Sequence, residues 1–157
     1  MTAQSPEEFV YKGKRYQGLY VEPLDEYLQS QNFEFQPIAS SCWRGYTCLW
    51  IISDYKLSLT HFSGAIRIYQ TEKNEFSPDR SYETKNISLN DLFPNQQNVF
   101  AEWFSGEIKL VRGIKPTDEE YCNYKKVIHL TFERGILVKE EILKNKISFL
   151  PSWLRFW

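Results

Sequence analysis

Apolar and polar residues alternate in short runs along most of this chain, and turn-forming residues separate the runs. Alternation with a period of two predicts β-strands, and its repetition excludes an all-helical fold. The runs expected to form strands are 9–11, 16–21, 47–53, 56–62, 65–71, 99–104, 107–112, 124–132 and 136–143. The predicted fold class is mostly β (α+β): an antiparallel curved sheet or partly closed β-barrel with one or two short helices.

Turn signals join several of these runs into hairpins, and the expected turns are residues 12–15, 54–55, 105–106 and 133–135. In this scheme the run 99–104 pairs with 107–112, and 124–132 pairs with 136–143. The polar stretch 72–86 contains a proline and is expected to form a long exposed loop.

Two short segments have helical signals instead. Leu24, Tyr27 and Leu28 fall at i, i+3 and i+4, which predicts one short amphipathic helix after Pro23. Further along, Ser88 is expected to cap a single helical turn that ends before a proline.

The strand expected at 47–53 is apolar on both faces, which predicts a central position with cover on both sides. Its faces hold Cys48, Trp50 and Ile52 on one side, and Leu49 and Ile51 on the other. In the next strand, His61 has the same parity as Leu57 and Leu59, so we expect a buried, hydrogen-bonded ring. His129 lies on the polar parity of its own strand and is expected to face solvent.

Chain length and net charge limit the number of domains and the kinds of partner that can be expected. The 157 residues predict a single domain, 1–157, and the aromatic tail 147–157 is a candidate for a separate element. The formal net charge of −1 argues against a nucleic-acid binder, because such proteins neutralise phosphates with basic stripes. The polar N-terminus, the odd count of three cysteines and the lack of a long apolar run predict a cytoplasmic protein without a membrane span.

The stretch SSCWRGYTCLW, residues 40–50, is dense in side chains that could serve chemistry. Cys42 and Cys48 do not have the spacing of a zinc knuckle, and neither histidine has a second ligand at a suitable spacing. Cys48 is expected to be a small buried hydrophobe, whereas Cys42 is expected to be more exposed. Without a phosphate loop, nucleophile elbow or metalloprotease helix, the sequence predicts no catalytic residue, no metal and no cofactor.

Two sets of charged residues leave alternatives open. Arg44 can stack between Trp43 and Tyr46, either as an internal cation–π brace or as part of a recognition patch. The run Asp118, Glu119 and Glu120 is either a solvated helix start or an acidic face for a basic partner. The adjacent pairs 7–8 and 140–141 are expected to be solvated carboxylates.

Four sequence patterns occur in a distinctive order: SSCWRGY, W-x-I-x-x-x-x-L-x-L, DLFP and V-x-A-x-WFSG-x-I, which together cover about 40–113. This order resembles small bacterial proteins of the polymorphic-toxin or contact-inhibition immunity type. The resemblance implies a non-enzymatic protein that binds and neutralises a cognate toxin domain, and it assigns no functional residues. From the residues themselves, the candidates for partner binding are Arg44, Asp118, Glu119 and Glu120.

Two other classes remain open at this point. One is a small-molecule-binding β-barrel with a cavity lined by Trp50, Trp103 or Tyr69, since the aromatic content is high. The other is an enzyme whose site is assembled only by the fold and therefore leaves no motif in the sequence.

Overall fold

The computed structural model of the chain describes residues 6–19, 21–37, 42, 44–69, 81–112 and 126–144. Its first strands are β1 (Glu8–Tyr11), β2 (Lys14–Gly18), β3 (Tyr46–Ser53), β4 (Lys56–Tyr69) and β5 (Tyr82–Ser88). They are followed by β6 (Val99–Phe100), β7 (Gly106–Val111), β8 (Lys126–Glu133) and β9 (Ile136–Lys144). Two short helices, α1 (Asp25–Gln29) and α2 (Leu89–Leu92), complete the described elements, and neither is long and apolar enough to cross a membrane.

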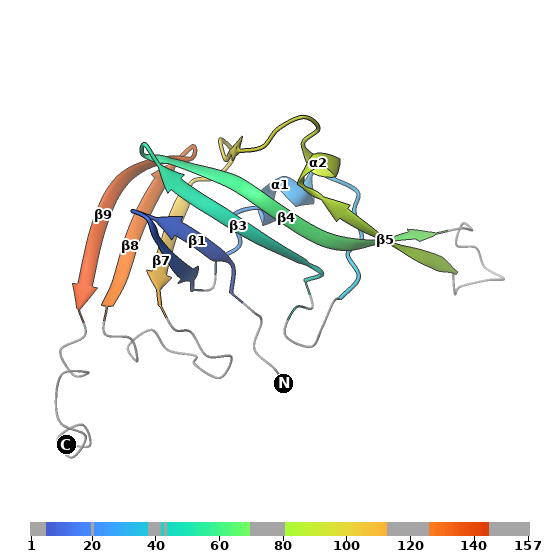
Figure 1. Ribbon diagram of the computed structural model, residues 1–157, viewed down its shortest axis with the longest axis horizontal. Helices are drawn as coiled ribbons and strands as arrows, with labels where there is room; N and C mark the ends of the chain where they lie inside the picture. Colours follow the sequence, from blue (N-terminus) through green and yellow to red (C-terminus); the bar gives the residue numbers. More distant parts are fainter. Residues whose placement is uncertain are drawn as a thin grey trace, which may run out of the picture.

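Seven of these strands close a barrel in the order β3-β1-β2-β7-β8-β9-β4, because β4 pairs with β3 (Figure 1). β5 and β6 stay outside the ring and pair with β4. The β4–β9 seam is short, with one Cα pair between Lys56 and Ile136. The predicted mostly β class is confirmed.

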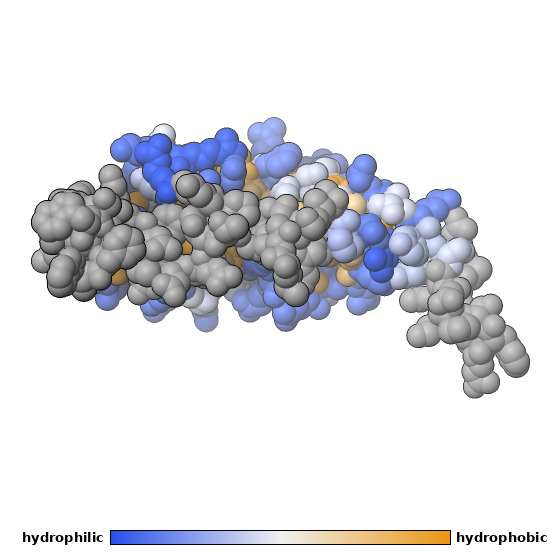
Figure 2. Space-filling view, turned by 90° about the horizontal axis from the view of Figure 1, so that it is seen from below, coloured by the Kyte–Doolittle hydropathy of each residue, from blue (hydrophilic) through white to orange (hydrophobic). Residues whose placement is uncertain are grey.

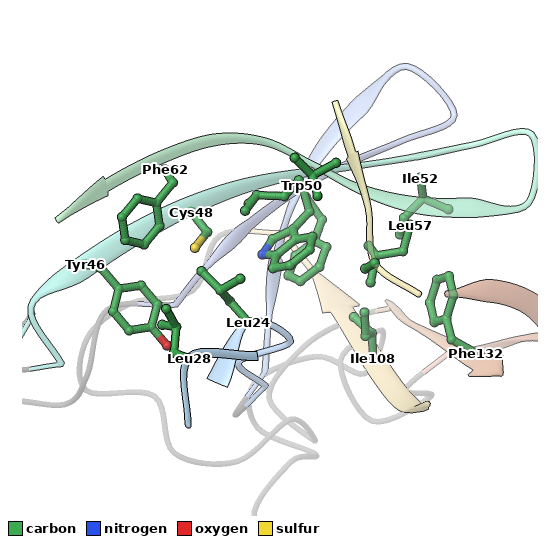
Figure 3. Packing of buried hydrophobic residues seen from close by; sticks show 14 of the residues in the cluster. Leu24, Leu28, Tyr46, Cys48, Trp50, Ile52, Leu57, Phe62, Ile108 and Phe132 are labelled. Atoms are coloured by element: carbon green, nitrogen blue, oxygen red, sulfur yellow. The ribbon is translucent and has the colours of Figure 1, made fainter. Parts of the chain in front are cut away.

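One strand pair is parallel, β1 with β3, whereas the other described pairs are antiparallel. β2 ends beside the start of β1, where the Gly18 N–H donates to the Glu7 carbonyl at 2.9 Å. β3 also starts at this end of the barrel and runs alongside β1, with Glu8 opposite Leu49. Leu24 and Leu28 are buried under β3 and cap this end (Figure 3).

Tight turns form three of the predicted hairpins, β1–β2, β3–β4 and β8–β9. Both central residues of each turn have positive φ, which suits the right-handed twist of a two-residue hairpin: Lys12 and Gly13, Asp54 and Tyr55, Arg134 and Gly135. Glycine is required at Gly135 in the β8–β9 turn, because a Cβ there would lie 2.5 Å from the Ala101 carbonyl oxygen.

The predicted hairpin between 99–104 and 107–112 is wrong. β6 pairs with β4, and β7 pairs with β2 and β8. After β6 the chain turns, with the Phe104 N–H donating to the Ala101 carbonyl at 3.0 Å. The Trp103 indole N–H donates to the Pro23 carbonyl at 2.7 Å, which holds this turn outside the sheet edge.

β4 is longer than predicted, since the runs 56–62 and 65–71 are one strand that ends at Tyr69. The loop predicted over 72–86 is partly wrong as well, because β5 starts at Tyr82 and pairs with the second half of β4. Residues 70–80 lie outside the described residues. Together β4 and β5 form a ribbon that projects away from the barrel (Figure 1).

A β-bulge explains the wrong prediction for His61. Leu49 is opposite His61 while Trp50 is opposite Leu59, so Thr60 is an extra residue in β4. The extra residue reverses the alternation, and the ring of His61 is exposed on the outside of the barrel. His129, expected to face solvent, is half-buried, and its Nε2 has no hydrogen-bond partner in the described structure.

Large side chains fill the barrel interior (Figure 3). Those with less than 2% of their surface exposed include Trp50, Phe9, Phe62, Phe132, Leu57, Leu59, Ile108, Leu110 and Leu130. Trp50 is fully buried as predicted, with its ring stacked on Phe9 at a centroid distance of 6.3 Å. Leu49 and Ile51, on the other face of β3, are half-buried, so the second face has less cover than predicted. On the face seen in Figure 2, most of the described surface is hydrophilic.

Candidate functional site

Arg44 lies just before β3 and has 9% of its side chain exposed. Its Nε donates to the Tyr46 carbonyl at 2.8 Å, and its guanidinium carbon is 5.3 Å from the centre of the Tyr46 ring. Its Nη1 also lies 3.5 Å from Glu22 Oε1. These contacts are those of an internal brace, one of the two predicted alternatives. Little of the side chain is left for a partner, and partner binding by Arg44 stays a prediction.

Beside this brace lies a buried carboxylate, Glu7, with 2% of its surface exposed. Its Oε2 accepts a hydrogen bond of 2.9 Å from the Trp50 indole N–H. Oε1 is buried without a partner in the described structure, and so is the Tyr46 hydroxyl. Tyr46, Cys48 and Trp50 alternate along β3 and point to the same inner face (Figure 3). The prediction that Glu7 is solvated is wrong.

Burial determines the protonation of this cluster. It raises the pKa of Glu7 to about 7, although the Arg44 charge and the Trp50 hydrogen bond oppose the rise. Burial also raises the pKa of the Tyr46 hydroxyl and of the Cys48 thiol, and the neighbouring Glu7 adds to both effects. A thiol with a raised pKa is a poor nucleophile at neutral pH, so Cys48 acts as a small packed side chain.

Cys42 is also buried, and its Sγ lies 3.4 Å from the Tyr46 carbonyl oxygen. The prediction that it is more exposed is wrong: the Gly45 N–H donates to the Cys42 carbonyl at 3.3 Å, and this turn holds Cys42 beside the start of β3. His61 is exposed on the outside of the barrel, away from the inner face that holds Cys48. Among the described residues, no three histidine, cysteine or acidic side chains gather as a metal site.

The projecting ribbon holds a second cluster, which we name the Tyr–Arg patch: Arg67, Tyr69 and Tyr82. The Tyr82 ring lies 4.9 Å from the guanidinium carbon of Arg67 and 5.6 Å from the Tyr69 ring, edge to face. Glu34 accepts hydrogen bonds from the Tyr69 hydroxyl at 2.6 Å and from Arg67 Nη1 at 3.2 Å.

Gln36 also fixes the patch, through a bond of 2.5 Å from Arg67 Nε to its side-chain oxygen. The segment that provides Glu34 and Gln36 runs along the edge of β4, where the Arg67 N–H donates to the Glu34 carbonyl at 2.8 Å. Three segments far apart in the sequence therefore meet here. Sequence patterns did not reveal the patch, because its members are separated by long stretches of chain.

The remaining predicted sites are not brought together. Asp118, Glu119 and Glu120 lie outside the described residues, as does the tail 147–157. Trp50 is inside the barrel, while Trp103 packs outside the ring against Phe93, 5.9 Å between ring centres. Tyr69 belongs to the Tyr–Arg patch, so the three aromatic residues proposed to line one cavity lie in different places.

Interior and exterior thus differ in chemistry: a closed cluster around Glu7 inside the barrel, and an ordered aromatic patch on its projecting ribbon. Both clusters consist of contacts between residues of this chain. Comparisons with protein-family models, with curated proteins and with solved structures found no match.

Proposed function

We propose that this chain is a non-enzymatic protein of the immunity type that binds and neutralises a cognate protein toxin domain. The resemblance of the segment 40–113 to such proteins is one support. The observation that carries the proposal is the Tyr–Arg patch, an ordered group of two tyrosines and an arginine on a ribbon that projects from the barrel.

Tyrosine and arginine are enriched among the residues that dominate binding energy in protein interfaces. Tyr82 has 43% of its surface exposed, so a partner can cover it. The other members are already held in place by Glu34 and Gln36. A partner that docks here orders few additional side chains, and this lowers the entropic cost of binding.

The affinity required of such a protein is high. To protect a cell, the complex needs a dissociation constant in the nanomolar range, about −12 kcal/mol. Interfaces of ordinary size reach this value through a few central anchors surrounded by weaker contacts. The Tyr–Arg patch has the composition and the order of such an anchor group.

The test is the binding kinetics of the purified chain with the protein encoded by the neighbouring gene, measured by surface plasmon resonance. Tyr82→Ala removes a ring in contact with Arg67 and Tyr69, and should weaken binding by about 2 kcal/mol, about 30-fold, mainly through faster dissociation. The matched control is Tyr55→Ala, which removes a tyrosine that is 72% exposed at the opposite end of β4. Equal effects of the two variants would exclude the patch, and absence of binding by the wild type would exclude the function.

The small-molecule alternative is favoured by one observation. Glu7 Oε1 and the Tyr46 hydroxyl are buried polar atoms without hydrogen-bond partners in the described structure. Such atoms cost free energy unless a bound group satisfies them. Native mass spectrometry of the purified chain, compared with Glu7→Gln, tests this alternative, which predicts a copurified small molecule that the variant loses.

A further inference from the structure

A gap in the sheet edge lies along β4 between β5 and β6. β5 pairs with β4 from Tyr69 back to Ser63, and β6 pairs with it at Ser58 and Leu59. The three residues between these pairings, Thr60–Phe62, have no strand partner on this edge among the described residues. We name this gap, with the side chains around it, the β4 notch.

The shape of the notch is fixed, because the chain that connects β5 to β6 around it is held in place at both of its ends. After β5, Ser88 begins α2 in a capping box, with its N–H donating to Asp91 Oδ2 at 2.7 Å. At the end of α2, Phe93 is buried and its ring stacks on Trp103 at 5.9 Å. The Asn95 N–H donates to Asn90 Oδ1 at 3.0 Å, which closes the loop before β6.

Side chains around the notch enclose an open groove of about 600 Å³, within the range of ligand sites. Its polar lining is dominated by exposed carboxamides, together with hydroxyl groups and the ring of His61; the carboxamides are Asn90, Asn95, Gln96 and Gln97. None of the lining residues is an acid, a lysine or an arginine. Each carboxamide offers both a donor and an acceptor, so the groove matches a neutral ligand that also offers both.

We propose that the β4 notch binds an extended, uncharged segment of a partner polypeptide, which fills the missing part of the strand edge. Main-chain groups of successive strand residues point alternately to the two edges, so at least one of the three open residues presents its N–H and C=O to the notch. A peptide in β conformation pairs with such an edge, while the carboxamides bond its outward main-chain groups.

The size of the gap and the lining both favour a peptide. At about 3.3 Å per residue, the open edge is about 10 Å long and takes a segment of three to four residues. A sugar would be expected to stack on a phenylalanine, tyrosine or tryptophan ring, but Phe62, the one such residue among those that line the groove, is 1% exposed. The bulge at Thr60 turns the ring of His61 to the outside of the barrel, where it can close over the segment.

This inference rests on the proposed function in one respect: the bound segment would come from the partner protein. The test uses a synthetic peptide in place of that partner. The probe is a blocked threonine–valine tetrapeptide, added to isotope-labelled full-length protein and followed by amide chemical shifts. We expect saturable shifts at residues 60–62 and 95–97, with millimolar affinity. An analogue methylated at alternate main-chain nitrogens should bind about tenfold more weakly, because it has lost hydrogen-bond donors.

The double change Gln96→Ala and Gln97→Ala should weaken the tetrapeptide by a similar factor. The matched control, Gln29→Ala with Gln31→Ala, removes one exposed and one half-buried carboxamide near α1 and should leave binding unchanged. Absent shifts, equal binding of the methylated analogue, or the same shifts with maltose would overturn the inference. These outcomes leave the partner kinetics of Tyr82→Ala untouched, so the two proposals fail separately.

Discussion

Replacing Glu7 by glutamine should stabilise the protein at neutral pH. Burial raises the pKa of this carboxyl from 4.5 to about 7, so keeping it ionised in the folded chain is unfavourable. The difference, multiplied by about 1.4 kcal/mol per pH unit, corresponds to about 3 kcal/mol. Glutamine has the same shape and stays neutral, and its side-chain oxygen can accept the hydrogen bond that the Trp50 indole donates at 2.9 Å.

The sign of the pH dependence follows from proton binding. Below about pH 4.5 the carboxyl is protonated in both states and contributes no pH dependence. Between about 4.5 and 7 the unfolded chain releases this proton while the folded chain retains it, so stability falls as pH rises. Above pH 7 the loss is complete. The free energy of unfolding of wild type minus that of Glu7→Gln should therefore decrease by about 3 kcal/mol from pH 4 to pH 8.

Urea unfolding at a series of pH values, followed by tryptophan fluorescence, measures this difference, and subtracting the variant removes the contributions of the other titrating groups. Glu140→Gln is the control with the opposite sign. The Tyr11 hydroxyl and Lys12 hold the pKa of Glu140 below its ordinary value, so its stabilising contribution is present near neutral pH and lost in acid. A difference curve for Glu7→Gln that does not change with pH would refute the buried, protonated carboxyl.

Three further predictions concern residues singled out in the sequence. Trp50→Ala should cost about 3–5 kcal/mol of a total stability of about 5–15 kcal/mol, measured by thermal unfolding, because the ring is fully buried. Arg44→Ala should lower the melting temperature and leave the partner kinetics nearly unchanged, since the side chain is 9% exposed. A normal melting temperature together with faster dissociation from the partner would contradict the role of an internal brace. Charge reversal at Glu119 and Glu120 should slow association with a basic partner and reduce its salt dependence, which stopped-flow mixing at two ionic strengths can measure.

Local patterns predicted the parts of the fold that local chemistry determines. The two-residue turns at 12–13, 54–55 and 134–135 are encoded by the turn residues themselves, and the hairpins around them are confirmed. The capping box of α2 is equally local, because Ser88 and Asp91 are three residues apart. These features need no information from elsewhere in the chain.

Errors arose where distant residues decide the outcome. The turn that separates β6 from β7 depends on the Trp103 indole, whose acceptor is the carbonyl of Pro23, 80 residues away. The orientation of His61 depends on the extra residue Thr60, whose hydroxyl donates to the Leu49 carbonyl across the pair at 3.1 Å. The alternation of apolar and polar residues does not reveal a bulge. Leu57, Leu59 and His61 are spaced two apart and look as though they share one face until the register with the partner strand is known.

The buried carboxylate is different, because the sequence did contain a signal for it. In β1, Phe9 and Tyr11 are buried while Glu8 and Val10 are half-buried, and Glu7 has the same parity as the buried pair. Glu8, on the other parity, forms an ion pair with Arg15 on the outer face. The two adjacent carboxylates thus point to opposite sides of one strand, as the period of two requires. A carboxylate in phase with buried aromatic side chains is therefore expected to be inside the barrel, where it needs a donor such as the Trp50 indole and a raised pKa to remain there.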